Sequence, residues 1–424
     1  MKQGGLLKLV QSQTSRVLSK WGLSQNPFVK TPPPEHVRRK VFTDREREMS
    51  RLLRSILTNP MNTLVFGEYG IGKTIFLLES LCELATDKKF FPIYTTLEGN
   101  TSSDFDVSVL FALSEAMYSW SERAKEIHDV LTGRSTSKET GREVGMDVGT
   151  GSLMPISITL GGQGTESQTI QRNAVSQPRH EFIMLLEECQ KRYSRIIIAV
   201  DEVDKQDPEK FYTLLSGSRA TLDVECSFIV TGGLWAPWLT QNPNRSIYGA
   251  FGEEIKLNPF NLSTTRDVII AYLNSAREKE NNHTWPFTED AIEYTFTRSK
   301  GVPRQFNHIC YEAINGVIDM ELDVEEIDKT IVEKCLKESG RGRYSNLQEN
   351  EQFIVDTIRC YGGILSNENT EALTSLGIFT VFDLAPVLDK LVQQDILVKR
   401  EGTRTIQYEI APSLAVAVDA QSAI

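Results

Sequence analysis

Eight consecutive residues have the spacing G-x-x-x-x-G-K-T of a phosphate-binding loop: Gly67, Glu68, Tyr69, Gly70, Ile71, Gly72, Lys73 and Thr74. In such a loop the glycines allow backbone N–H groups to surround phosphate oxygens, and the N-terminus of the next helix adds the positive end of its dipole. Lys73 would reach the β- and γ-phosphates of a nucleotide, and the Thr74 hydroxyl would coordinate Mg²⁺. The alternative is a chance glycine turn with a surface lysine.

The neighbouring residues supply the setting that this loop requires. Residues 62–66 are apolar and β-branched and predict a short strand, and Ile75 opens a run to Leu84 with apolar residues at helical spacing. Strand, glycine loop and helix in this order is the context in which the pattern binds phosphate. We therefore expect a nucleoside triphosphate with Mg²⁺ at residues 67–75.

Two acidic residues form a second candidate site. Residues 196–200 are all apolar and predict a strand buried on both faces, and Asp201 and Glu202 follow at its carboxyl end. Ligands bind at that end of the strands in parallel sheets. Asp201 suits Mg²⁺ through water, and Glu202 suits a base that orients and deprotonates attacking water. Acidic residues after a strand are common, so the combination with the phosphate loop gives this pair its weight.

Further strands are predicted at residues 90–95, 227–231 and 254–257, with helical segments between them. This alternation predicts an α/β fold with a parallel sheet. Thr231 ends the strand at 227–231, and its hydroxyl could lie near the γ-phosphate. The alternative is a threonine that merely ends a strand.

The composition of the chain indicates which class of protein it belongs to. A chain of 424 residues with 40% apolar and 24% charged residues should form two to three soluble domains. No apolar run approaches the roughly 20 residues of a membrane helix, and the N-terminus is no convincing signal peptide. The six scattered cysteines read as core residues in a reducing compartment, and the five histidines lack metal spacing, so we expect a cytoplasmic protein. The net charge of −11 argues against nonspecific coating of nucleic acid or membrane.

The segments before and after the sheet strands differ in character. We expect residues 1–20 to be a tail, Thr43 to cap a helix with Glu46 in a capping box, and residues 105–127 to be largely helical. The basic residues before Ile56 are either a docking surface or a solvated face. Residues 132–177 are rich in Gly, Ser and Thr and predict a protruding insertion with a hairpin across 149–152, either an oligomerisation or ligand-contacting arm or a flexible loop.

The C-terminal third is predicted to be helical from 263 to 339, with Thr288 and Pro303 opening two of its helices and Asp323 with Glu326 a third. We read residues 341–343 as a linker. Helices near 349–361, 370–376 and 383–393 then precede a hairpin at 396–400 and 405–410. Helices followed by a two-stranded hairpin are the winged-helix arrangement.

This order of parts resembles the AAA+ ATPases of the origin-recognition/initiator type. In that family an Asn-Pro-Phe-like box borders the adenine pocket, and here it corresponds to Asn26, Pro27 and Phe28. Lys73 and Thr74 correspond to the Walker A pair, and Asp201 and Glu202 to the Walker B pair. Thr231 lies where the family often has the asparagine of sensor 1.

Two arginines gain a role from the same resemblance. Arg304 in Gly301-Val302-Pro303-Arg304 looks like the sensor 2 residue that touches the γ-phosphate from the lid. Arg245 lies where the family places an arginine finger that completes the site of a neighbouring subunit. The alternatives are a surface helix-cap arginine for Arg304 and an ordinary loop arginine for Arg245.

The resemblance implies a P-loop AAA+ αβα sandwich with a parallel sheet at residues 21–258, a helical lid at 259–340 and a winged-helix domain at 345–412, followed by a tail at 413–424. It implies Mg²⁺-dependent hydrolysis of ATP and assembly into a homo-oligomer. The glycine-rich insertion is unlike the helical insertion of replication initiators. This difference favours relatives from mobile elements and antiviral defence, in which such an ATPase gates a partner effector.

Two other functions stay open: a signalling scaffold of the STAND type that uses ATP binding for assembly without DNA, and a replication-initiator-type ATPase that binds DNA. The predicted wing offers Lys399, Arg400 and Arg404 to nucleic acid. The unit from Arg341 onward is net negative, so DNA binding would be modest and salt-sensitive. A winged helix that docks a protein is the alternative.

Overall fold

The computed structural model describes residues 14–28, 33–58, 61–133, 175–203, 208–401 and 406–419. The chain divides into two compact units. We call residues 47–66 and 76–256 the sheet unit, and residues 1–46, 67–75 and 257–424 the helical unit. Most of the predicted insertion, including its hairpin, lies outside the described residues.

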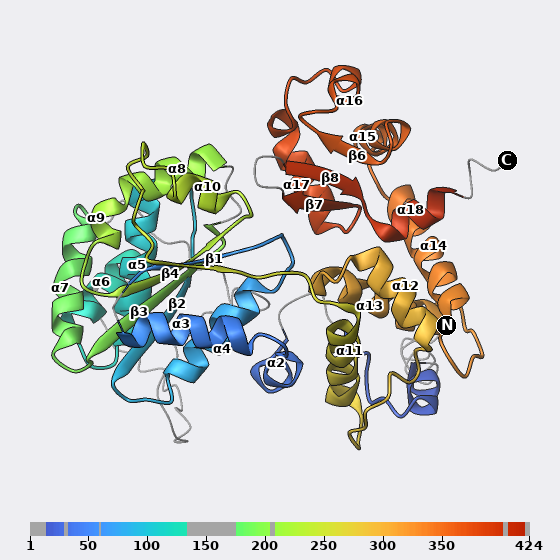
Figure 1. Cartoon of the computed structure of the whole chain (residues 1–424), viewed down its shortest axis with the longest axis horizontal. Helices are drawn as coiled ribbons and strands as arrows, with labels where there is room; N and C mark the ends of the chain where they lie inside the picture. Colours follow the sequence, from blue (N-terminus) through green and yellow to red (C-terminus); the bar gives the residue numbers. More distant parts are fainter. Residues whose placement is uncertain are drawn as a thin grey trace, which may run out of the picture. The chain divides into compact units, whose positions relative to one another are not determined.

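The sheet unit is built on five parallel strands in the order β2-β3-β4-β1-β5 (Figure 1). Their bounds are Thr63–Phe66 (β1), Phe90–Thr96 (β2), Arg195–Asp201 (β3), Ser227–Gly232 (β4) and Glu253–Lys256 (β5). Each lies within about two residues of its prediction, because these runs are apolar and β-branched and bounded by polar residues. The predicted parallel α/β sheet is confirmed.

Helices connect these strands. Their bounds are Glu46–Thr58 (α3), Lys73–Leu84 (α4), Ser102–Met117 (α5), Glu122–Leu131 (α6), Pro178–Gln190 (α7), Pro208–Gly217 (α8), Arg219–Leu222 (α9) and Ala236–Thr240 (α10). The prediction that residues 105–127 are largely helical is confirmed, although two helices share this segment. The helix breaks after Met117, because Ser121 takes an extended conformation and its side chain caps α6 by accepting from the N–H of Ala124 at 3.1 Å.

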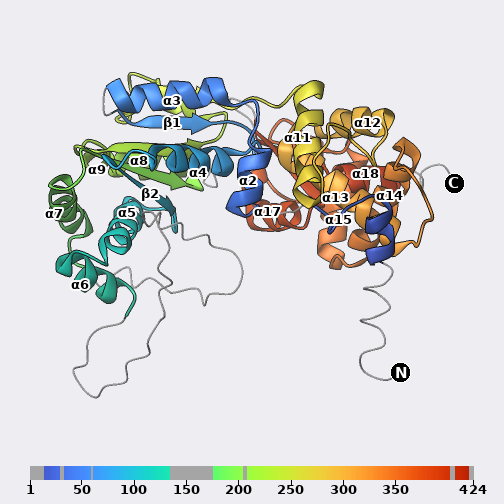
Figure 2. The same ribbon diagram turned by 90° about the horizontal axis from the view of Figure 1, so that it is seen from below.

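The core of the sheet unit lies between the strands and the helices that cover them. Helices α5 and α7 pack together on the side of β2 and β3, and α3 lies beside β1 and β5 (Figure 2). Phe228 of β4 contacts Phe105 of α5 and Phe182 of α7, with ring centroids 6.0 and 6.3 Å apart. All three side chains are fully buried, so close packing fixes the amino end of β4 against these two helices.

The part of the helical unit before residue 349 is built mainly from α2 and the longer helices α11 to α14. Their bounds are Glu35–Val41 (α2), Leu262–Ala276 (α11), Glu289–Ser299 (α12), Pro303–Asp319 (α13) and Lys329–Ser345 (α14). Residues 14–20 are helical as well, and Leu18, Trp21 and Phe28 are buried in the core formed by these helices. The predicted N-terminal tail is therefore wrong for residues 14–20, because their apolar side chains have a core to enter.

Several predicted helix boundaries are also wrong. Helix α3 begins at Glu46, and Asp44 in the left-handed region (φ 55°) separates it from Thr43, so Thr43 does not cap it. Asp328 caps α14 by accepting from the N–H of Ile331 at 2.8 Å, so Asp323 does not start that helix. Residues 341–343 are no linker but lie within α14, since a single Gly costs a helix only about 1 kcal/mol.

The chain ends in a C-terminal module, residues 349–410, with its own apolar core. Its helices are Glu349–Cys360 (α15), Thr370–Ser375 (α16), Val381–Leu384 (η2) and Ala385–Gln393 (α17), and its strands are Ile364–Ser366 (β6), Leu397–Glu401 (β7) and Ile406–Ile410 (β8). The strands form an antiparallel sheet in the order β6-β8-β7, of which β7 and β8 are the predicted hairpin.

Two elements at this end were not expected from the sequence. Strand β6 has only three residues, too few for a period to show. Helix α18 (Pro412–Asp419) occupies most of the predicted C-terminal tail and packs along α14, with Leu414 buried (Figure 1). The prediction of a tail from residue 413 is wrong up to Asp419, because this apolar segment finds a partner helix.

Two glycines provide a test of the helical unit. Gly301 has φ 74°, and a Cβ there would lie 2.0 Å from the Phe260 carbonyl oxygen, whereas exposed Gly342 in α14 has open space around it. We expect Gly301→Ala to lower the free energy of unfolding by about 3 kcal/mol and Gly342→Ala to raise it by about 1 kcal/mol. Urea unfolding followed by circular dichroism measures both, and equal effects of the two changes would contradict the structure.

Candidate functional site

The phosphate loop leaves the sheet directly at the end of β1. Gly70 and Gly72 have φ of 80° and 98°, a region that side-chain-bearing residues rarely adopt, which explains the glycines at these positions. Lys73 is the first residue of α4, and its buried Nζ donates to the carbonyl oxygens of Gly67 at 2.8 Å and Glu68 at 3.0 Å. The loop thus curls around the Lys73 ammonium group, which would bind the phosphates of a nucleotide.

The register of the sheet sets the second part of the site. Val200 of β3 pairs with Val230 of β4, and Thr231 of β4 pairs with Val65 of β1. Asp201 and Thr231 are therefore level with each other at the carboxyl end of the sheet, where β1 passes into the phosphate loop. The structure brings these two predicted residues to one edge, as the sequence led us to expect.

Asp201 is held in a fixed orientation. Its carboxylate is buried and accepts from the Tyr94 hydroxyl at 3.0 Å and from the N–H of Glu202 at 2.8 Å. Tyr94 was not among the residues predicted from the sequence. The available signal was a polar-tipped aromatic residue near the carboxyl end of the predicted neighbouring strand, because such a residue reaches toward the same edge as the acid.

Glu202 is half-buried and lies in the left-handed region with φ 63°. A glutamate in this conformation is uncommon and carries strain on the order of 1 kcal/mol. Strain of this kind is often found where a side chain is aimed for function.

The Thr231 hydroxyl is fully buried and has no hydrogen-bond partner among the described residues. An unpartnered buried hydroxyl beside an acid at this edge fits a polar ligand.

Arg304 lies at the phosphate loop. It is the second residue of α13, its N–H donates to the Gly70 carbonyl at 3.2 Å, and its guanidinium carbon lies 4.9 Å from the centroid of the Tyr69 ring. A Cβ on Gly70 would be 2.8 Å from the Cβ of Arg304, so only glycine permits this approach. The predicted sensor 2 residue and the predicted phosphate loop are therefore in contact.

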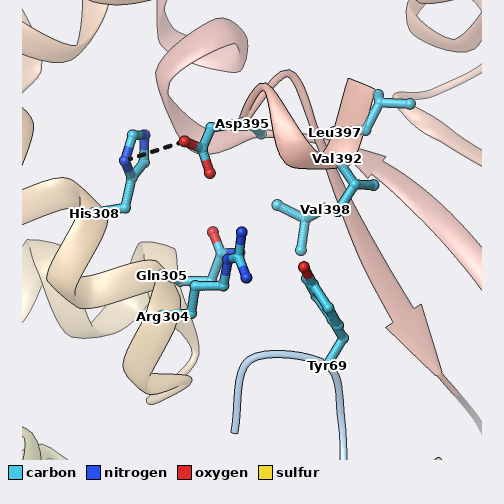
Figure 3. A pocket seen from close by; sticks show the side chains of 9 residues that line it. Tyr69, Arg304, Gln305, His308, Val392, Asp395, Leu397 and Val398 are labelled. Carbon is cyan, nitrogen blue, oxygen red and sulfur yellow. Dashed lines mark ion pairs between the residues drawn. The ribbon is translucent and has the colours of Figure 1, made fainter. Parts of the chain in front are cut away.

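Around this contact the side chains of the C-terminal module line a small cavity (Figure 3). It is lined by residues from the phosphate loop, α13 and the module: Tyr69, Arg304, Gln305, His308, Val392, Asp395, Leu397, Val398 and Ala411. His308 of α13 and Asp395 of the module face each other across it, with Nδ1 and Oδ2 3.7 Å apart.

Arg245 lies in the sheet unit, on the loop between α10 and β5. Its guanidinium carbon is 4.4 Å from the Tyr212 ring centroid and 5.0 Å from that of Trp238, and Glu209 lies at 3.6 Å. A hydrogen bond with Ser246, together with the nearby Arg245 charge, lowers the pKa of Tyr212. Two aromatic rings and a carboxylate thus hold an arginine whose side chain is 19% exposed.

The other predicted site residues are less accessible than expected. Asn26 donates to the Tyr311 carbonyl at 3.2 Å, and Phe28 beyond Pro27 is fully buried against Tyr272. This box therefore fixes the N-terminal segment to α11 and α13.

The predicted nucleic-acid residues of the wing are paired within the chain. Lys399 lies 3.8 Å from Asp389, and Arg400 lies 3.4 Å from Glu68 and 3.2 Å from Glu409. Their side chains are 11% and 12% exposed. Arg404 lies outside the described residues.

Other kinds of site find no support in the described part of the chain. It contains no cluster of three or more His, Cys, Asp or Glu side chains that could hold a metal ion. Burial raises the pKa of Cys189 and of Cys335 to about 12, as expected for core thiols. No helix among the described residues is long and apolar enough to cross a membrane.

One segment of the chain matches a known protein family. Residues 42–213, which include the phosphate loop, Asp201 and Glu202, match the family described as an ATPase domain predominantly from Archaea. This segment of the chain is therefore similar to an ATPase domain. The predicted enzyme class and P-loop fold are thereby confirmed. No curated protein matches the chain in sequence.

Solved structures resemble the chain over most of its length. The ORC1 protein of Aeropyrum pernix, solved in complex with DNA, is 16% identical, with 92% of this chain and 94% of that chain covered and a TM-score of 0.49. Cdc6p of Pyrobaculum aerophilum is 15% identical, with 92% and 98% covered and a TM-score of 0.43. The RuvB branch migration motor of Thermotoga maritima is 14% identical, with 94% and 99% covered and a TM-score of 0.37. Likenesses this distant do not transfer a function to the ATPase domain.

The backbone of Glu202 yields a stability prediction. Glu202→Gly should raise the free energy of unfolding by about 1 kcal/mol, because glycine adopts a positive φ without strain. Glu321→Gly is the matched control, since exposed Glu321 also has a positive φ (52°) but lies after α13. Both should stabilise the chain in urea unfolding, whereas Glu202→Ala should not. A loss of stability in Glu202→Gly would mean that the side chain supports the fold.

Proposed function

We propose that this protein is a Mg²⁺-dependent ATP-hydrolysing switch that acts as an assembly of several copies. The observation that carries the proposal is the placement of Asp201 and Thr231 level at the sheet edge where β1 enters the phosphate loop. The match of residues 42–213 to an ATPase family supports it. Phosphoryl transfer depends mainly on positioning and charge stabilisation, which this set of side chains can supply.

Each of these residues is assigned a separate role in ATP binding and hydrolysis. The N–H groups of residues 67–75 and the Lys73 ammonium would hold the phosphates, with Lys73 exchanging its bonds to loop carbonyls for phosphate oxygens. Thr74 and Asp201 would hold Mg²⁺, which neutralises developing charge when bound. Glu202 would orient and deprotonate the attacking water. The Thr231 hydroxyl would donate toward the γ-phosphate and gain the partner that it lacks among the described residues.

The roles of Lys73 and Glu202 are separable by mutation. Lys73→Ala should weaken ATP binding by about 100-fold, because it removes the cation that receives the phosphates. Glu202→Gln should leave binding nearly unchanged and slow turnover by about 10²–10⁴-fold. Isothermal calorimetry and a phosphate-release assay measure these effects. Undiminished turnover in Glu202→Gln would remove Glu202 as the base.

Arg245 is proposed to act on the nucleotide of a neighbouring copy. Its cation is held between Tyr212 and Trp238, and Trp238 and Tyr248 are exposed aromatic side chains near it. Trp, Tyr and Arg are the residues most enriched at energetically important contacts between proteins. The competing candidate, a scaffold that binds ATP for assembly without turnover, would not need an arginine aimed at a second site.

Mixing two inactive variants tests this arrangement. Arg245→Ala should lower turnover by about 10³-fold, because a finger supplied in trans stabilises transition-state charge. Adding Lys73→Ala protein, which is itself inactive but keeps Arg245, should restore hydrolysis at the intact nucleotide sites of the Arg245→Ala copies. The double variant Lys73→Ala/Arg245→Ala is the control and should restore nothing. Equal rates with both partners would exclude a shared site.

The functions of the C-terminal module remain predictions. We propose that it is a winged helix, with nucleic acid as the candidate partner that the cations of its wing suggest. Lys399 and Arg400 are nevertheless engaged with carboxylates of this chain, so a phosphate backbone would have to replace Asp389, Glu68 and Glu409. The predicted effector partner rests on the sequence alone.

A further inference from the structure

Glu68 and Tyr69, the two residues that follow Gly67 in the phosphate loop, contact the C-terminal module. Arg400 Nη1 of β7 lies 3.4 Å from the Glu68 carboxylate, and Tyr69 packs against the module's apolar core. The side chains of Arg400 and Glu68 are 12% and 25% exposed, so this ion pair is shielded from water. A partly buried pair is screened less by salt than a surface pair and contributes more to docking.

The Tyr69 ring is shared between two groups. Figure 3 shows it pointing into the cavity between Arg304 of α13 and Val398 of β7. The Arg304 guanidinium carbon lies 4.9 Å from the ring centroid, a cation–π distance. Arg304 therefore holds the ring from the lid side while apolar residues of the module hold it from the other. Neither contact is required for the loop to hold phosphate, since that uses backbone N–H groups and Lys73.

From these contacts we infer that Glu68 and Tyr69 make the phosphate loop the docking site of the C-terminal module, and that ATP loosens this docking. The γ-phosphate and the Tyr69 ring compete for the same guanidinium. An anionic phosphate attracts an arginine more strongly than a neutral ring does, so Arg304 turns to the phosphate. Tyr69 then loses its support, and of the two contacts that the phosphate loop makes with the module only the Arg400–Glu68 pair remains. ADP lacks the γ-phosphate and leaves the contact in place.

The inference rests on the proposed function at one point, the approach of Arg304 to the γ-phosphate. The docking contact itself is independent of nucleotide. Its consequence for partners is direct, because departure of the module separates Arg400 from Glu68. In the ATP-bound protein an anionic partner then has only Glu409 to displace from Arg400, so it binds there more tightly than in the ADP-bound protein.

The native cysteines make the docking measurable in the full chain. Cys360 on α15 is exposed and the other five cysteines are buried, so a spin label goes to the module. A second label on Glu293→Cys, an exposed position of α12 in the same helical unit, provides a reference point on the lid helices. Pulsed electron resonance between the labels gives the distance distribution and hence the ratio of undocked to docked protein.

Without nucleotide, Glu68→Gln and Arg400→Gln should each raise this ratio about fivefold. The double variant should raise it no further, because both changes remove one interaction. Lys300→Gln is the matched control: Lys300 also pairs with the wing, at 3.3 Å from Glu409, but its side chain is 61% exposed. It should change the ratio less than about twofold. Fully additive effects of the two main variants would overturn the docking contact.

With a non-hydrolysable ATP analogue the ratio should rise about tenfold, and with ADP it should stay within about twofold of the nucleotide-free value. Arg304→Gln should abolish the response to the analogue. Calorimetry on the same labelled protein separates the two failures. An unchanged or lower ratio with bound analogue would refute ATP control and leave the ATPase proposal intact. Absence of binding would refute the ATPase proposal and, with it, ATP control, while the nucleotide-free variants still decide the docking contact.

Discussion

The parallel register of β1, β3 and β4 is the constraint on which the rest of the site depends. It fixes the level at which each chain leaves the sheet, so Asp201 and Thr231 end at the height of the β1 terminus. A shift of one residue would send each side chain to the opposite face of the sheet. The buried aromatic contacts of Phe228 with α5 and α7 oppose such a shift. The chemistry at the edge therefore depends on apolar packing well inside the unit.

Much of this was readable from the sequence because local and long-range signals agreed. The strands are apolar runs with polar ends, and the loop pattern depends on consecutive residues, so neither needs knowledge of the fold. Tyr94 was not predicted, since its value lies in a hydroxyl that reaches Asp201 on the adjacent strand. The same holds for Glu68 and Tyr69: their place in the loop was predicted, but their contacts with the C-terminal module join residues far apart in the chain.

The errors share a physical origin. Thr43 and Asp323 each satisfied a capping pattern, yet the backbone placed the helix starts at Glu46 and Lys329. A capping residue contributes only about 1 kcal/mol, so burial of the neighbouring side chains decides where a helix begins. The predicted tails failed for the same reason, because residues 14–20 and α18 each gain an apolar partner that no local pattern reveals. Lys399 and Arg400 looked available for nucleic acid because only folding brings their acidic partners to them. Those partners are Asp389, Glu409 and the distant Glu68.

Helix α14 runs without a break, so it is a rigid connection between the elements at its two ends. Its 17 residues run from the lid helices to the C-terminal module without a hinge, and α18 folds back along it as a brace. A helix of that length is about 25 Å long. A rotation of a few degrees where α13 meets the phosphate loop would become a displacement of roughly 1–2 Å at the far end of such a helix. The protein thus has the parts of a stiff lever whose fulcrum is the loop.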